Sequence, residues 1–440
     1  MKMAPHLYPA LRYLYQRSIN ITSPTTTIDY IGSQWINPSD IFSILLLLGP
    51  EIVQHAVAQL AGHCVTPVAF SFGWVAYSAK ALLAVFGDGL LMPEVGVSNV
   101  TVIGVESGHI RITGSWVLGK LLSFLNDTVD EDMSIEQSHI PPDASSSERK
   151  IKDTEHGRPW EALRISVFET IDDPKYTHGV PIRDAVWYSG YAVIILQLII
   201  AVIPIILHRE WGTLFITVYG NTLALLEGSL TQWKEEKWPC PRSGGSSVIL
   251  TQGNGTRHAC LILGAKGVGL DLEILAVGTR RVSPSLLTRL GVAILTVNWI
   301  ILLITAAGLQ LNTWYLFGIG VIGSIQNLVA AGLSRSPSAL GVHIRDTQRP
   351  IRGPSVKQVL KEAEELYPGV GVQMAQIFYP GSMRVQESEF PFWREAQDRL
   401  LGPNKWGTRI DRLPPPVAGV SHGAADEIMG PGEKTSLLLW

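Results

Sequence analysis

The chain has 440 residues, enough for about two or three domains of ordinary size, and its formal net charge of −3 is close to neutral. A chain without a basic surplus lacks the electrostatic footprint of a nucleic-acid-binding protein, so we expect no nucleic-acid partner. Its three cysteines (Cys64, Cys240 and Cys260) are an odd number without CxxC spacing, which favours neither a disulfide framework nor a thiolate zinc site.

Three hydrophobic blocks dominate the chain: residues 36–86, 185–230 and 286–333. Each block is long enough to cross a bilayer twice, because a spanning helix needs about 20 mostly apolar residues. Each also contains a polar break or a helix breaker near its middle. The blocks predict an α-helical polytopic membrane protein with about six spans arranged as three hairpins. Less than half of the chain lies in these blocks, which explains a mean hydropathy of only +0.20.

The first hairpin (36–86) is the weakest of the three. Pro50, Glu51 and His55 interrupt its first half, and Pro67 and Lys80 interrupt its second half. The block therefore fits either a pair of true spans or a re-entrant element, and the sequence leaves both interpretations open.

Hairpins place both termini and all the long polar segments on one side of the membrane. Most basic residues near the spans lie in those segments, whereas the opposite side offers little besides Arg209. By the positive-inside rule we expect both termini, including the N-terminal segment 1–35, to be cytoplasmic. Residues 1–23 contain no secretory signal-peptide pattern.

The two segments between the hairpins carry strand patterns. In residues 87–184, alternating apolar residues flank a turn at 106–108, residues 115–125 read as a short helix, and 126–156 reads as a disordered acidic linker. In residues 231–285, strands at 248–252 and 257–263 flank Gly253-Asn254-Gly255, and residues 270–274 suggest a third strand. We expect these two segments to assemble into one small cytosolic β-rich domain.

The C-terminal part divides into a cytosolic tail (334–401) with one amphipathic helix at 355–366 and a Pro- and Gly-rich tail (402–440) that we expect to be unstructured. The partners expected from this layout are the lipid bilayer and proteins that bind the β-domain and the tail.

Several short motifs resemble those of a known family. Because of these motifs the chain resembles, over about residues 28–393, a family of multi-pass membrane proteins of filamentous fungi. No reaction is assigned to that family. The resemblance implies the architecture and a fungal source. The motifs are Asn37-Pro38-Ser39-Asp40-Ile41-Phe42, Gly179-Val180-Pro181-Ile182-Arg183-Asp184, and Thr251-Gln252-Gly253-Asn254-Gly255 with Gly269-Leu270-Asp271-Leu272-Glu273.

Ionisable residues inside the blocks are the first site candidates, because charge is costly in a bilayer. Glu51 and His55 lie four residues apart, on one face of a predicted span with Gln54 beside them, and could pass a proton or bind a cation. The alternative is an interfacial helix or a contact between helices. Lys80 and Glu227 lie near predicted span ends, where snorkelling is a sufficient explanation.

Uncharged polar residues in the other spans have two interpretations. They can hydrogen bond between helices, at about 1 kcal/mol or less per contact, or they can line a polar translocation path. The sequence does not separate the two. The residues are Gln197, Asn221, Asn298, Gln326 and Asn327.

Other motifs support no specific chemistry. Residues 126–130 match the start of the Asn-Asp-x-x-Asp motif of membrane prenyltransferases, but the later Asp of that motif falls at Ser134, so a solvated linker is the better interpretation. The glycine-rich stretch 264–269 reads as a turn between strands, and His258 as a sheet residue without a metal partner. We expect no cofactor and no metal.

Three roles follow from these observations. The favoured one is a non-enzymatic organising or interaction role, because no catalytic constellation is visible. The second is a small-molecule transporter or channel-like protein that uses the polar residues of the spans. The third is a membrane enzyme acting on a lipid or isoprenoid-like secondary metabolite, with Glu51 and His55 as acid and base.

Overall fold

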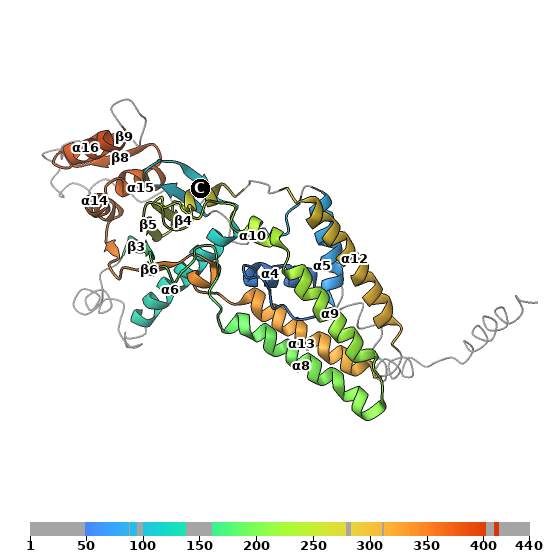
Figure 1. The fold of residues 1–440 in the computed structure, drawn as a ribbon. Coiled ribbons are helices and arrows are strands. Elements are labelled where there is room, and N and C mark those ends of the chain that lie inside the picture. Colours follow the sequence, from blue (N-terminus) through green and yellow to red (C-terminus); the bar gives the residue numbers. More distant parts are fainter. Residues whose placement is uncertain are drawn as a thin grey trace, which may run out of the picture.

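The computed structural model describes residues 49–87, 89–94, 100–137, 161–278, 283–309, 312–401 and 409–412. It consists of an elongated bundle of helices and, at one end of that bundle, a sheet with further helices packed around it (Figure 1). We call these parts the helix bundle and the sheet domain, and we call the end of the bundle next to the sheet its domain end.

Four long helices form the frame of the bundle. Their lengths are 24, 17, 22 and 20 residues. The second helix returns antiparallel beside the first, after a turn in which Arg209 takes the left-handed conformation. The helices are α8 (Ala185–His208), α9 (Gly212–Gly228), α12 (Leu286–Ala307) and α13 (Thr313–Gly332).

Within the described residues, α8, α12 and α13 are long and apolar enough to cross a membrane. Their outward side chains, such as Ile199, Ile206 and Ile304, are aliphatic and exposed, as expected for a surface that faces lipid. The chain is therefore a helical protein with three candidate membrane spans, and six spans in three hairpins are not confirmed.

The first hydrophobic block differs most from a pair of spans. Its helices, α4 (Pro50–Leu60) and α5 (Gly73–Phe86), have only 11 and 14 residues, or about 16 and 21 Å at 1.5 Å per residue. Residues 61–72 join them without helical structure, and residues 66–72 are entirely buried. In the described part of this block, two short helices thus flank a buried non-helical stretch, and neither helix is among the candidate spans. Residues 36–48 lie outside the described chain.

The sheet domain is built from segments that are far apart in the sequence. Its order is β2-β1-β4-β5-β3-β6, with β7 also pairing with β3. The predicted assembly of the two inter-hairpin segments into one sheet is observed, and the tail adds two strands to it. The strands are β1 (Thr101–Gly104), β2 (Ile110–Ile112), β3 (Leu163–Thr170), β4 (Val248–Thr251), β5 (His258–Leu263), β6 (Ile344–Asp346) and β7 (Ile351–Gly353).

Three local predictions are wrong: the strand at 270–274, the full length of the disordered linker at 126–156, and the tail with a single helix. The expected strand at 270–274 is helix α11 (Leu272–Val277), because the Asp271 side chain accepts a hydrogen bond from Ile274 N and caps a helix there. Helix α6 (Trp116–Gln137) continues well into the expected linker, of which residues 138–160 lie outside the described chain.

The tail also folds beyond its one predicted helix, α14 (Val356–Leu366). It adds η1 (Pro337–Leu340), α15 (Val370–Phe378), β8 (Ser382–Val385), α16 (Phe390–Leu401) and β9 (Arg409–Arg412). Of the predicted unstructured tail, 402–408 and 413–440 lie outside the described residues.

Charged side chains, of which Arg335 and Lys237 are buried, connect the two parts of the molecule at what we call the joint. Asp184, which caps α8, receives two hydrogen bonds of 2.7 and 2.8 Å from Arg335, the first basic residue after α13. Lys237, at the end of α10 (Thr231–Lys237), donates to the carbonyl oxygens of Gln59 and Ala61 at the end of α4. Burial lowers the pKa of Lys237 well below its usual range, and either charge state of its amine can donate these bonds.

Candidate functional site

The most unusual feature of the bundle is a non-helical segment, residues 66–72, which bonds to α8, α9 and α13 and which we call the extended segment. It starts at the domain end, where Thr66 N donates to Ser229 Oγ just beyond α9. It reaches the middle of the bundle at Phe70, whose carbonyl oxygen accepts from Gln197, halfway along α8. Helix α5 then returns beside α12, with Ser78 on Thr296 at 2.9 Å.

An extended backbone at this depth needs hydrogen-bond partners, because unpaired backbone groups in a bilayer cost several kcal/mol each. Four side-chain amides provide them, and we call these residues the amide cluster. Gln326 Oε1 accepts from Ala69 N at 3.2 Å, and Asn221 Oδ1 accepts from Phe70 N at 3.1 Å. Gln197 donates to Phe70 O at 2.8 Å, and Asn327 donates to Ser71 Oγ at 3.0 Å and more weakly to Ala69 O.

Amides suit this position because each has a donor and an acceptor and can match either backbone group. The cluster is also connected within itself, since Asn221 Nδ2 donates to Gln197 Oε1 at 3.0 Å. Gln326 and Asn327, candidates from the sequence, therefore bond to the extended segment rather than to a facing helix. Nothing in the local sequence indicates this, because the partner is main chain.

Glycines let the helices approach the segment closely. A side chain at Gly190 of α8 would collide with the carbonyl group of Pro67, and one at Gly323 of α13 with that of Phe70. Gly220 of α9 packs directly against the Phe70 ring. Three helices thus hold the segment by steric fit as well as by hydrogen bonds.

Glu227 is completely buried in α9, so snorkelling does not explain it. Its Oε2 accepts a hydrogen bond from Trp299 Nε1 of α12 at 2.6 Å. Trp299 stacks on Trp74, at the start of α5, with ring centroids 5.8 Å apart. Glu227 thus joins α9 to α12 beside the start of α5.

The remaining candidates lie away from the segment. Glu51 is exposed and His55 half-buried on α4, and neither hydrogen bonds to the segment in the described structure. Gln54 is buried and donates to Leu91 O at 2.7 Å, and Lys80 is exposed on α5. Asn298 accepts from Tyr219 OH at 2.6 Å, between α12 and α9. His55 lies within electrostatic range of Glu51, Lys80 and Lys120, whereas Gln54 and Asn298 have the separate partners just given.

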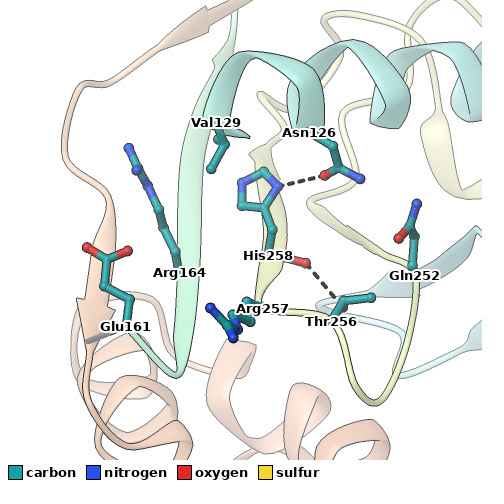
Figure 2. A pocket seen from close by; sticks show the side chains of 8 residues that line it. All are labelled: Asn126, Val129, Glu161, Arg164, Gln252, Thr256, Arg257 and His258. Atoms are coloured by element: carbon teal, nitrogen blue, oxygen red, sulfur yellow. Dashed lines mark hydrogen bonds between the residues drawn. The ribbon is translucent and has the colours of Figure 1, made fainter. Parts of the chain in front are cut away.

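A second site lies in the sheet domain, where a pocket of about 280 Å³ opens between α6 and the ends of β3 and β5 (Figure 2). Strands β3 and β5 pair in parallel with Arg164 opposite His258. Asn126 of α6 reaches down onto the His258 ring. Asn126 and His258 are 132 positions apart in the sequence, so no local pattern could have predicted their contact.

No group of three or more His, Cys, Asp or Glu side chains that could hold a metal ion occurs in the described part of the chain. No protein-family model, curated protein or solved structure matches the chain, so its function has to be inferred from its own residues.

Proposed function

We propose that this protein moves a small molecule or ion across a membrane, as a transporter or channel-like protein whose path is closed by the extended segment. The observation that supports this most is the buried, non-helical backbone in the middle of the bundle. A bundle that only anchors a domain needs no such element, because continuous helices satisfy their own backbone. Broken helices and irregular backbone at membrane depth are typical of channels and transporters.

The strength of the hydrogen bonds fits a segment that can move. Hydrogen bonds between groups in membrane bundles contribute about 0.6 kcal/mol each on average. Four amide contacts to the segment therefore hold it with roughly 2–3 kcal/mol in addition to packing. Amides freed by such a movement would present donors and acceptors, but no fixed charge, to a passing solute.

The other two roles have less support. An enzyme would use Glu51 and His55 as acid and base, but Glu51 is exposed and His55 half-buried on α4, and neither belongs to the amide cluster. An organising role gives no physical reason for the extended segment. It becomes the better explanation if the segment proves immobile and closed to water.

We also propose that the sheet domain is cytoplasmic. Arg183, Lys234 and Arg289 lie at the domain end of the helices, whereas Arg209 lies at the turn between α8 and α9. This distribution follows the positive-inside rule. Membership of the fungal multi-pass family remains part of the proposal and adds no reaction to it.

Cysteine accessibility tests the proposal without knowledge of the substrate. In a Cys64→Ser background, Ser71→Cys should react with a small cationic methanethiosulfonate reagent when the protein is in vesicles. Thr296→Cys is the matched control, since Thr296 is equally buried but packs on α5 away from the segment. We expect Ser71→Cys to react at least about tenfold faster, as for a site that opens in a minor state.

Equal, slow reaction at the two positions would overturn the proposal. A second measurement uses vesicles containing the protein, with light scattering to follow glycerol and urea entry and dyes to follow proton and potassium flux. Gln197→Leu should change the flux of at least one solute, and Asn298→Leu, at the edge of the bundle, should not.

A further inference from the structure

A pocket of about 200 Å³ in the helix bundle is lined by residues of α4, of α13 and of the extended segment. Three of its lining residues are buried: Val53 of α4, Ser71 of the segment and Asn327 of α13. Two others, Ile325 and Leu328, are exposed on the side of α13 that we expect to face lipid. The bundle pocket, as we call it, therefore leads from the lipid-facing surface to a floor that belongs to the amide cluster.

The floor of the bundle pocket has an unused hydrogen-bond acceptor. Asn327 is completely buried, and its Nδ2 donates to Ser71 Oγ at 3.0 Å and to Ala69 O at 3.4 Å. Because the carbonyl group can only accept, these bonds place the nitrogen, and Oδ1 is the remaining atom of the amide. Oδ1 is buried without a hydrogen-bond partner in the described structure. An unpaired buried acceptor is costly, and a ligand that donates a hydrogen bond to it removes that cost.

A hydrogen-bond donor lies beside this acceptor. Ser71 Oγ accepts from Asn327, so its hydroxyl hydrogen is left over, and no group in the described part of the chain accepts it. Oδ1 lies about 2.2 Å from Nδ2 by the bond lengths of an amide, so it is no more than about 5 Å from Ser71 Oγ. One oxygen atom can bridge that distance with two hydrogen bonds of ordinary length. The floor thus matches a hydroxyl group, which donates to Oδ1 and accepts from Ser71.

The walls of the bundle pocket favour a neutral and mostly apolar molecule. Most of the described lining residues are aliphatic, none of them is charged, and the polar ones are Ser71, Ser324 and Asn327. A charged group would lose its hydration there without a compensating charge, which is strongly unfavourable. The volume of about 200 Å³ is below the 300–1,000 Å³ of sites for drug-sized ligands, so the pocket holds a short alcohol or the hydroxyl end of a longer one.

We propose that the bundle pocket binds a neutral lipophilic alcohol that enters from the lipid. Its hydroxyl group lies between Asn327 Oδ1 and Ser71 Oγ, and its hydrocarbon part lies against the aliphatic walls of α4 and α13. The pocket exists while the extended segment is in place. The inference therefore does not require the movement of the segment on which the proposed transport depends.

Photolabelling of the full-length protein in lipid vesicles tests the proposal with 3-azioctanol, a diazirine-bearing alcohol whose attachment sites are read by mass spectrometry. We expect labelling of the peptides that contain Ile52 and Leu328, and we expect 1-octanol to compete for it. 1-Methoxyoctane is the matched competitor, because it keeps the chain and the oxygen atom but cannot donate to Asn327. For equal competition its concentration in the membrane should be at least about tenfold higher, as expected for one lost hydrogen bond to a buried acceptor. Octanoate, which is charged, should compete no better than the ether.

Three variants separate the pocket from the rest of the lipid-facing surface. Ser324→Leu fills the pocket without removing either group of the floor, and should abolish the labelling for which 1-octanol competes. Val329→Leu is its matched control, because Val329 is exposed on the same helix but outside the lining, and this variant should label as the parent protein does. Asn327→Leu removes the acceptor, so 1-octanol and 1-methoxyoctane should compete equally well in that variant. If Asn327→Leu fails to fold, the comparison of Ser324→Leu with Val329→Leu still decides.

Equal competition by 1-octanol and 1-methoxyoctane in the parent protein, unchanged labelling in Ser324→Leu, or labelling that 1-octanol does not reduce would each overturn the proposal. Hexadecan-1-ol as a further competitor distinguishes the two sources of the hydroxyl group: competition as strong as that of 1-octanol assigns the site to a long membrane alcohol, and weaker competition assigns it to a short one. A segment that proves closed to water would end the transport proposal but would leave all of these results unchanged.

Discussion

Substituting Gly323 by Ala should loosen the extended segment selectively. A methyl group at this position of α13 would stand 2.9 Å from the carbonyl carbon of Phe70, closer still to its oxygen, and 2.7 Å from Gln197 Nε2. Carbon atoms in contact are normally about 3.5–4.0 Å apart, so the segment has to move away by roughly 1 Å. That movement breaks the 2.8 Å bond from Gln197 to Phe70 O and strains the bond from Phe70 N to Asn221.

The expected loss of folding free energy is the sum of the two weakened hydrogen bonds and the overpacking. Hydrogen bonds in membrane bundles contribute about 0.6–1.7 kcal/mol each, and overpacking a core costs about 1–3 kcal/mol. Gly323→Ala should therefore destabilise the protein by roughly 2–6 kcal/mol. Gly318→Ala is the control on the same helix, because a methyl group there meets nothing within 4 Å and improves helix propensity by up to about 1 kcal/mol.

Thermal unfolding in detergent, followed by intrinsic tryptophan fluorescence, measures both effects. We expect a lower midpoint for Gly323→Ala and an unchanged or higher midpoint for Gly318→Ala. If the two variants are equally stable, the segment does not pack against α13 as described, and the reasoning about the amide cluster fails with it.

Three further measurements test other parts of the molecule. Lys237→Met should lower stability by about 1–3 kcal/mol, because the buried carbonyl group of Ala61 loses the Lys237 donor, whereas Gln59 O keeps its bond from Arg335 Nη1. Lys234→Met on the same short helix should have little effect, and melting curves of both variants decide this. Burial lowers the pKa of His258 to about 4 from the usual 6.5. The free energy of unfolding should therefore keep its full contribution from neutral His258 above pH 6.5 and fall by about 3 kcal/mol as the pH is lowered to 4. His258→Gln should remove this part of the pH dependence of the melting midpoint. Cys64 is exposed where the chain enters the extended segment and should react with an impermeant maleimide only from the cytoplasmic face; labelling from the other face alone would reverse the proposed orientation.

The sequence predicts the parts of the fold that depend on local pattern. Long apolar runs indicated α8, α12 and α13, and an Asn-Gly turn indicated the hairpin of β4 and β5. Amphipathic spacing predicted α14 to within one residue. In each of these cases one stretch of chain contains both the signal and the partner that satisfies it.

The parts that the sequence did not predict depend on distant partners. Pro50 and Pro67 mark breaks in the first block, but they do not tell whether the chain between them spans, turns or runs extended. Gln197 and Asn221 do bond between helices, Gln197 to Ile319 O of α13 and Asn221 to Gln197. Only the fold shows that both also bond to the main chain of Phe70. Alternating apolar residues around Leu272 fit a strand as well as a helix, and the cap at Asp271 decided the outcome.

Helix α6 contacts both the joint and the pocket of the sheet domain. The Trp116 ring near its start lies 5.5 Å from Lys237 Nζ, and Asn126 lies ten residues, or about 15 Å, further along. At that distance a unit charge in this pocket would act on Lys237 through its field with only about 0.3 kcal/mol at the dielectric constant of water, before salt screens it further. Charge in the pocket is therefore a weak influence on the joint, and a movement of α6 is the stronger connection between the two.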